Sequence, residues 1–115
     1  MIQIKRVYEE YEEKDGYRIL VDRLWPRGLS REKAHLDEWL KDIAPTDELR
    51  KWFNHDPERY TEFKQRYEKE LKEHAGLLEE IRKKAAHHRV TLLYGAHDEQ
   101  HNQAVVLLEV LSEKH

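Results

Sequence analysis

The stretch VTLLYG at residues 90–95 decides the fold of this chain of 115 residues. Its β-branched and apolar residues follow one another without alternating with polar ones, which is typical of a strand buried on both faces, and Gly95 ends the run. The stretch YRILVD at residues 17–22 rises to a similar apolar centre. Strands of this kind occur in parallel sheets that are covered by helices. The sequence therefore predicts an α/β protein.

Weaker signals supply the rest of the sheet. Ile2 and Ile4 alternate with polar residues and predict a short strand at the start of the chain. A short fourth strand is expected within residues 36–43. No repeat or linker interrupts the pattern. We therefore expect a single domain over residues 1–115, with a small, mostly parallel sheet of three to four strands flanked by helices.

Helix starts are marked by capping residues. Ser30, Thr46 and Asp56 each carry an oxygen that can accept hydrogen bonds from the first turn of a helix. Apolar residues then recur at spacings of three and four, which is the helical pattern. We expect helices after these three residues, the third running to about His74, another over residues 77–89, and a last one from near Asp98 or Glu99.

Composition excludes several classes of function. The chain has no cysteine, so no disulfide, zinc–thiolate site or cysteine nucleophile can form. Its formal net charge of -3 does not favour nucleic acid as a partner, because phosphate backbones attract basic surfaces. No apolar signal segment follows the first residues, and the longest apolar run, residues 104–108, is far too short to span a bilayer. We therefore expect a cytoplasmic protein without a membrane partner.

The loop after residues 17–22 carries side chains that suit an anion. Arg23 and Arg27 are planar donors that can grip a phosphate or a carboxylate with two hydrogen bonds each. Trp25, which precedes a proline, stiffens the loop, and Gly28 lets the backbone approach closely or turn. Asp22 at the end of the strand is a candidate catalytic carboxylate. The structural alternative is that the arginines pair with nearby acidic residues while Trp25 fills the core.

The loop after residues 90–94 offers a second set of candidates. Gly95 and the helix expected to begin near Asp98 direct backbone N–H groups into one space, where the helix dipole favours an anion. His101, predicted in the first turn of that helix, is the candidate general acid or base, with Asp98 beside it. Tyr94 and Asn102 are further candidate ligand contacts. The structural alternative is a polar, solvent-facing loop with Tyr94 in the core.

These two loops are expected to share one site. The carboxyl ends of neighbouring parallel strands meet at one edge of a sheet, about 4.8 Å apart, and ligands of α/β proteins collect there. We therefore predict that Arg23 or Arg27 approaches Asp98, His101, Asn102 or the backbone of the glycine that ends the strand, leaving a polar pocket. Antiparallel strands would instead send the loops to opposite ends of the sheet.

Both loops also carry a family resemblance. The stretches LVDRLWPRGLS at residues 20–30 and LLYGAHDEQHNQAV at residues 92–105 resemble two signature segments of the YeaO-like proteins, small bacterial proteins in a domain-of-unknown-function family, DUF 488. The resemblance extends over essentially the whole chain. It implies an intracellular protein without a settled activity, so no catalytic residue is carried over. It also implies that the two loops recur together as one design.

The leading hypothesis is a small cytoplasmic protein that binds a compact anionic ligand, phosphate-bearing or carboxylated, between the two loops. Turnover stays open at this point: in an enzyme, His101 would handle protons and the arginines would hold negative charge. One alternative is a noncatalytic module whose charged helices contact a protein or nucleic-acid partner. A second is a metal-dependent hydrolase using Asp22, Asp98, His97 and His101. The residues identify neither a cofactor nor an oligomeric state.

Overall fold

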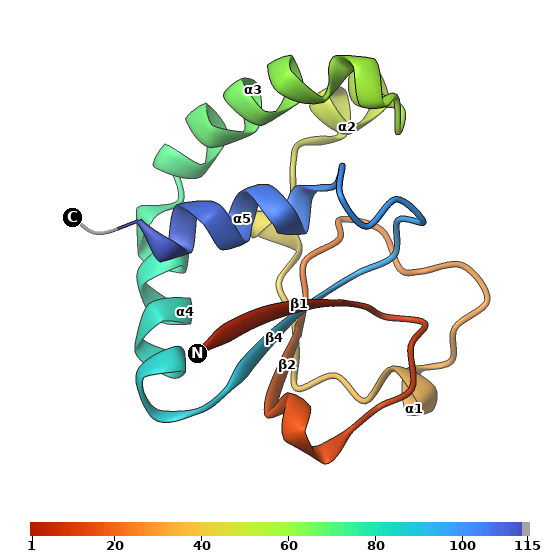
Figure 1. The fold of residues 1–115 in the computed structure, drawn as a ribbon, viewed down its shortest axis with the longest axis vertical. Helices are drawn as coiled ribbons and strands as arrows, with labels where there is room; N and C mark the ends of the chain where they lie inside the picture. Colours follow the sequence, from red (N-terminus) through yellow and green to blue (C-terminus); the bar gives the residue numbers. More distant parts are fainter. Residues whose placement is uncertain (114–115) are drawn as a thin grey trace.

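A parallel sheet forms the centre of the computed structural model, which describes residues 1–113 (Figure 1). Its strands are β1 (Ile2–Arg6), β2 (Tyr17–Leu20), β3 (Glu38–Trp39) and β4 (Val90–Tyr94), in the spatial order β1-β4-β2-β3. Every neighbouring pair is parallel. The predicted α/β class, the small sheet and the short strand within residues 36–43 are therefore confirmed.

β4 occupies the middle of this arrangement. Its first residue, Val90, is in register with Ile2 of β1 on one side and with Tyr17 of β2 on the other. Just beyond β2, the N–H of Val21 donates to the carbonyl of Leu93 over 3.0 Å. All residues of β4 are buried. The unbroken apolar run in the sequence follows from this position, because both edges of the strand are paired and both faces are covered.

The helices cover the two faces unequally. α2 (Asp47–Phe53), α3 (Tyr60–Lys72), α4 (Ala75–His87) and α5 (Gln103–Ser112) contribute to the main core, whereas the single turn α1 (Arg31–Ala34) lies away from them (Figure 1). Short 3-10 helices occupy Glu13–Asp15, Lys41–Ile43 and Pro57–Arg59. The opposite face of the sheet has a smaller core of Val7, Leu20 and Leu93, covered by the segment that includes Trp25 and Trp39.

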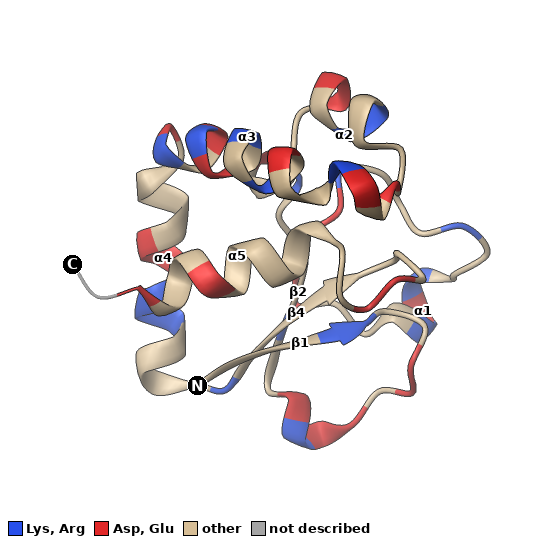
Figure 2. Cartoon of the chain, turned by 45° about the horizontal axis from the view of Figure 1, so that its top comes forward, with Lys and Arg blue, Asp and Glu red and all other residues tan. Residues whose placement is uncertain are grey.

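α5 and α3 differ in charge because they occupy different depths. α5 packs against β1, β4 and α3, and its buried residues include Ala104, Leu107 and Leu111. In Figure 2, α5 is almost wholly uncharged, whereas acidic and basic residues alternate along α3. α5 is thus the inner helix and α3 the outer one. Among residues 1–113, no helix combines the length and the apolar character that crossing a membrane requires.

Three expected helix boundaries are corrected. α5 begins at Gln103, several residues after the predicted start near Asp98 or Glu99, because the side chain of Asn102 and not that of Asp98 caps it. α4 already begins at Ala75. α3 ends at Lys72, slightly before the expected end. The first correction matters for the site, because it places the predicted acid–base residue in the loop before the helix.

The sheet face away from the main core holds a buried network of charges. Asp15 and Arg18 are each 1% exposed, and Nη1 of Arg18 donates to Asp15. Nζ of Lys5 lies 3.1 Å from Oδ2 of Asp15, and the other guanidinium donors reach the backbone carbonyls of residues 34–35. Burial alone would raise the pKa of Asp15, but the N–H of Glu12 and the two cations together lower it below the ordinary value. This carboxylate therefore fastens the segment after β1 to β2.

Asp15→Asn should destabilise the protein strongly, because it leaves two cations without their shared counter-charge in a buried place. Losing one partner of a buried pair removes about 3–5 kcal/mol of unfolding free energy. Glu12→Gln is the matched control, since Glu12 pairs with the same lysine but its side chain is 49% exposed, and surface pairs contribute at most about 1 kcal/mol. Urea unfolding measures both variants. Equal losses would show that the buried network does not support the fold.

Candidate functional site

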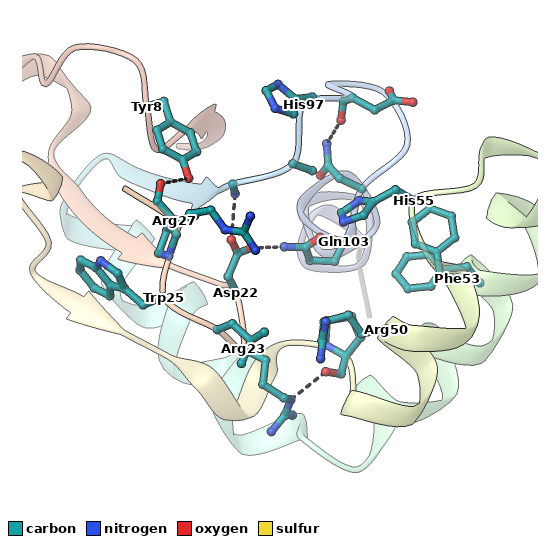
Figure 3. Close-up of a pocket in the computed structure, with 18 residues that line it drawn as sticks. Tyr8, Asp22, Arg23, Trp25, Arg27, Arg50, Phe53, His55, His97 and Gln103 are labelled. Atoms are coloured by element: carbon teal, nitrogen blue, oxygen red, sulfur yellow. Dashed lines mark hydrogen bonds between the residues drawn. The ribbon is translucent and has the colours of Figure 1, made fainter. Parts of the chain in front are cut away.

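A cavity of about 560 Å³ opens where β2 and β4 end (Figure 3). Its walls come from the loop after β1, the loops after β2 and β4, the start of α5, and α2 with the turn that follows it. The residues lining it are Tyr8, Asp22, Arg23, Leu24, Trp25, Pro26, Arg27, Pro45, Arg50, Phe53, His55, Phe63, Gly95, Ala96, His97, Asp98, Asn102 and Gln103. The parallel strands thus bring the two signature loops together.

Asp22 joins these loops. Its Oδ2 accepts a hydrogen bond of 2.9 Å from the N–H of Gly95, and its Oδ1 accepts one from Nε2 of Gln103 at the start of α5 (Figure 3). The sequence predicts that the backbone N–H of Gly95 binds the anion of a ligand. The structure instead places a carboxylate of the chain itself there, so the contact between the loops is made by Asp22 and not by an arginine.

Gly95 is required by how closely this carboxylate approaches. A Cβ at this position would lie 2.9 Å from Oδ2 of Asp22, closer than nonbonded contacts allow, and its next neighbours would be Pro26 and Tyr8. The glycine is therefore explained by close approach to a side chain, and not by a left-handed turn. Gly28 is the opposite case: its φ of 74° is left-handed, nothing lies within 4 Å of its Cβ position, and it does not line the cavity.

The environment of Asp22 changes its protonation. Burial raises the pKa of Asp22 to about 6, although the hydrogen bonds from Gly95 and Gln103 favour the charged form and lower it. Burial dominates because it removes most of the water that would solvate the charge. The carboxyl group consequently gains or loses its proton near pH 6.

The two predicted arginines behave differently. Nε and Nη2 of Arg23 donate to the backbone carbonyls of Pro45 and Ala44 over 2.8 and 3.1 Å, so this side chain fastens the loop to the segment before α2. The side chain of Arg27 is exposed and extends into the cavity (Figure 3). Within residues 1–113, its guanidinium has no hydrogen bond, ion pair or ring contact, while its backbone carbonyl accepts from the hydroxyl of Tyr8.

A third arginine, which sequence reasoning missed, lines the opposite wall. Nη2 of Arg50 in α2 lies 3.3 Å from Oδ1 of Asp47. Its Nε is buried and finds no hydrogen-bond partner among the described residues. Buried donors in native proteins are nearly always paired, so this nitrogen, which is closed to solvent, is an exception.

The predicted acid–base pair lies largely outside the cavity. Nδ1 of His101 is 2.9 Å from Oδ2 of Asp98, and the imidazole meets the ring of Tyr60 edge-on with 5.1 Å between centroids. Asp98 lines the cavity but His101 does not. Oδ1 of Asp98 accepts from the N–H groups of Gln100 and His101, and these bonds lower its pKa together with that from the imidazole. The pair stabilises the turn before α5.

The remaining predicted contacts have structural partners. Oδ1 of Asn102 accepts from the N–H groups of Ala104 and Val105, so the start of α5 is capped from within the chain. Nε1 of Trp25 donates to the carbonyl of Leu29 over 2.7 Å, and its ring meets that of Trp39 edge-on with 5.3 Å between centroids, while part of the residue lines the cavity. Tyr94 is 2% exposed and belongs to the main core.

Some lining residues had a signal that the sequence analysis did not use. Tyr8 follows β1, whose carboxyl end lies beside that of β4, so the rule applied to the other two loops covers it as well. Arg50, Phe53 and His55 had no such signal, because only tertiary packing brings α2 to this edge. Among the described residues, no group of three or more His, Asp or Glu side chains is placed to hold a metal ion.

Together, the parallel sheet and the cavity at its carboxyl edge define a small α/β protein with a ligand-sized hollow between two characteristic loops. The chain belongs to the family described as the inactive DUF488-N3 subclade, whose model matches residues 1–115. The resemblance noted from the two motifs is thereby confirmed.

Relatives match along nearly their whole length. The chain is 46% identical over 110 residues to the uncharacterized protein YeaO of Escherichia coli (strain K12), covering 96% of each chain. It is 40% identical over 111 residues to the uncharacterized protein Rv3073c of Mycobacterium tuberculosis (strain ATCC 25618 / H37Rv), covering 96% of this chain and 93% of that one. No solved structure matches the chain.

Gly95→Ala should destabilise the protein by about 1–3 kcal/mol, because the new methyl group displaces the carboxylate that accepts from this residue's own N–H and leaves buried polar groups unpaired. Gly76→Ala is the matched control: nothing lies within 4 Å of its Cβ position in α4, and alanine favours a helix over glycine by about 1 kcal/mol. Thermal and urea unfolding measure both. A stable Gly95→Ala variant would contradict the close approach of Asp22.

The raised pKa of Asp22 predicts a pH dependence of stability. A carboxyl whose pKa is higher in the folded state binds protons more tightly there, so it stabilises the fold most below its unfolded pKa near 3.8, and this contribution is lost as pH rises through about 6. The shift corresponds to about 3 kcal/mol. Asp22→Asn should remove this fall between pH 4 and pH 7 in unfolding free energies. A wild-type curve that matches the variant's across this window would contradict the shift.

Proposed function

We propose that this protein binds a compact organic anion, phosphate-bearing or carboxylated, in the cavity at the carboxyl ends of β2 and β4. The observation that carries the proposal is the unpaired guanidinium of Arg27 in a cavity whose opposite wall carries Arg50. Arg27 has no side-chain partner within residues 1–113, and Arg50 brings a second positive charge to the same cavity. A ligand's phosphate or carboxylate supplies the acceptors that the protein lacks.

The size and lining of the cavity favour an organic anion over a simple ion. A volume of about 560 Å³ falls within the range of small-molecule sites, about 300–1,000 Å³. Ring side chains of Tyr8, Trp25 and Phe53 contribute to the walls. Such sites join apolar contact with a few charged groups that orient the ligand, and this cavity has both.

Binding without turnover is the version that the observations support. The family to which the chain belongs is described as an inactive subclade. His101, to which the sequence assigned proton transfer, is held by Asp98 and Tyr60 and does not line the cavity. The start of α5 is capped by Asn102, so the arginines carry the attraction for the anion in place of the helix N-terminus.

Arg27→Ala should weaken binding of phosphate-bearing compounds about ten- to a hundredfold, because hydrogen bonds to charged groups contribute about 1.5–3 kcal/mol. Suitable probes are pyrophosphate and ribose 5-phosphate, titrated by calorimetry. Arg89→Ala is the matched control, since Arg89 is an exposed arginine at the amino end of β4, away from the cavity. Its affinities should stay within about twofold of wild type. Identical titrations of wild type and Arg27→Ala would contradict the proposal.

A further inference from the structure

We infer that the ligand of this cavity is a phosphorylated nucleoside of guanine type, whose planar ring donates two adjacent N–H groups to Asp22 while its phosphate faces Arg27. This inference rests on the proposed function and adds the chemistry of the ligand's second end. It follows from three features of the cavity: the acceptor at its floor, the distribution of charge and the ring-bearing walls.

Asp22, at the floor of the cavity, has hydrogen-bond acceptor sites that the chain does not use. A carboxylate offers about four lone-pair sites on its two oxygens. Within the chain, Oδ2 of Asp22 accepts from Gly95 and Oδ1 accepts from Gln103, one hydrogen bond on each oxygen. Each oxygen therefore has the capacity to accept a further hydrogen bond. Two parallel donors on one planar group satisfy both, as the ring N–H and neighbouring amino group of guanine do.

The distribution of charge favours a ligand that also carries hydrogen-bond donors over one that is only an anion. Asp22 places a negative charge at the floor, and a phosphate against it would be repelled at close range. The guanidinium without a partner among the described residues belongs to Arg27 in the loop after β2, and Arg50 in α2 adds a second positive charge on the opposite wall. A ligand that satisfies both regions is negative at one end and donates hydrogen bonds at the other.

The walls suit a flat ring. Figure 3 shows Tyr8 and Trp25 on one side of Asp22, and Phe53 and His55 on the other. Aromatic faces bind bases by stacking, which contributes about 1–3 kcal/mol per base. Phe53 already stacks on Phe63 and Trp25 packs against Trp39, so the exposed ring of Tyr8 is the face that remains for a base. A free phosphate or a sugar phosphate would not use it.

Calorimetric titration of the wild-type protein with three phosphates tests the ring requirement without any mutation. Guanosine monophosphate should bind at least tenfold more tightly than ribose 5-phosphate, which has the phosphate and the sugar but no base. Adenosine monophosphate should fall between them, because it can stack but presents a ring acceptor where guanine presents a donor. Guanosine monophosphate that binds no more tightly than ribose 5-phosphate overturns the inference.

Asp22→Asn tests the partner of the ring. Its amide keeps an acceptor for Gly95 but offers only one free acceptor to the ligand, so the affinity for guanosine monophosphate should fall at least tenfold. The affinity for ribose 5-phosphate should stay within about twofold. Asp42→Asn, an exposed aspartate outside the cavity, is the control and should change neither. Melting curves recorded first show that each variant is folded.

The outcomes separate the two levels of the proposal. Ribose 5-phosphate that binds through Arg27, with no gain from the guanine ring, overturns the ligand class and leaves the proposed function standing. Equal losses of both phosphates in a folded Asp22→Asn protein also overturn the ligand class, because Asp22 would then act only by shaping the site. If neither pyrophosphate nor any of the three phosphates binds wild type, both the proposed function and the ligand class fail.

Discussion

The hydrogen-bond ladders on the two edges of β4 are the constraint on which the rest of the molecule depends. β1 and β2 have no ladder with each other, and each is placed by its pairing with β4. Because all these ladders are parallel, the loops after β1, β2 and β4 meet at one edge of the sheet. The hydrogen bond from Gly95 to Asp22 then ties two of these loops together. The cavity is a consequence of topology first and of individual side chains second.

The same hydrogen bond changes what the site can hold. A glycine after a buried strand, beside the start of a helix, ordinarily offers its N–H to a bound anion. Here Asp22 accepts that hydrogen bond, so the chain brings its own negative charge to the place where a ligand's would go. The arginines that line the same cavity carry the opposite charge. The cavity therefore presents two opposite charges at different places.

The sequence alone is enough to predict the parallel sheet and the meeting of the two loops. Periodicity and β-branched residues identify strands, and parallel pairing then follows from the strands being buried on both faces. It is not enough to predict where individual side chains point and which groups they contact. Asp98 and Asn102 are both good capping residues, and only the path of the loop decides that Asn102 caps α5. Likewise, Arg23 binds carbonyls of residues 44–45, a partner that no local pattern reveals.

The place of β4 in the sheet also determines when the sheet can form during synthesis. Ile2 pairs with Val90, and Tyr17 pairs with the same residue from the other side. In a nascent chain, β1 and β2 therefore lack the strand that pairs with both of them until the ribosome has made residues 90–94. Contacts so far apart in sequence form slowly, and unpaired strand edges favour aggregation while they wait. The order in which the chain is made therefore leaves the central strand until after the three other strands.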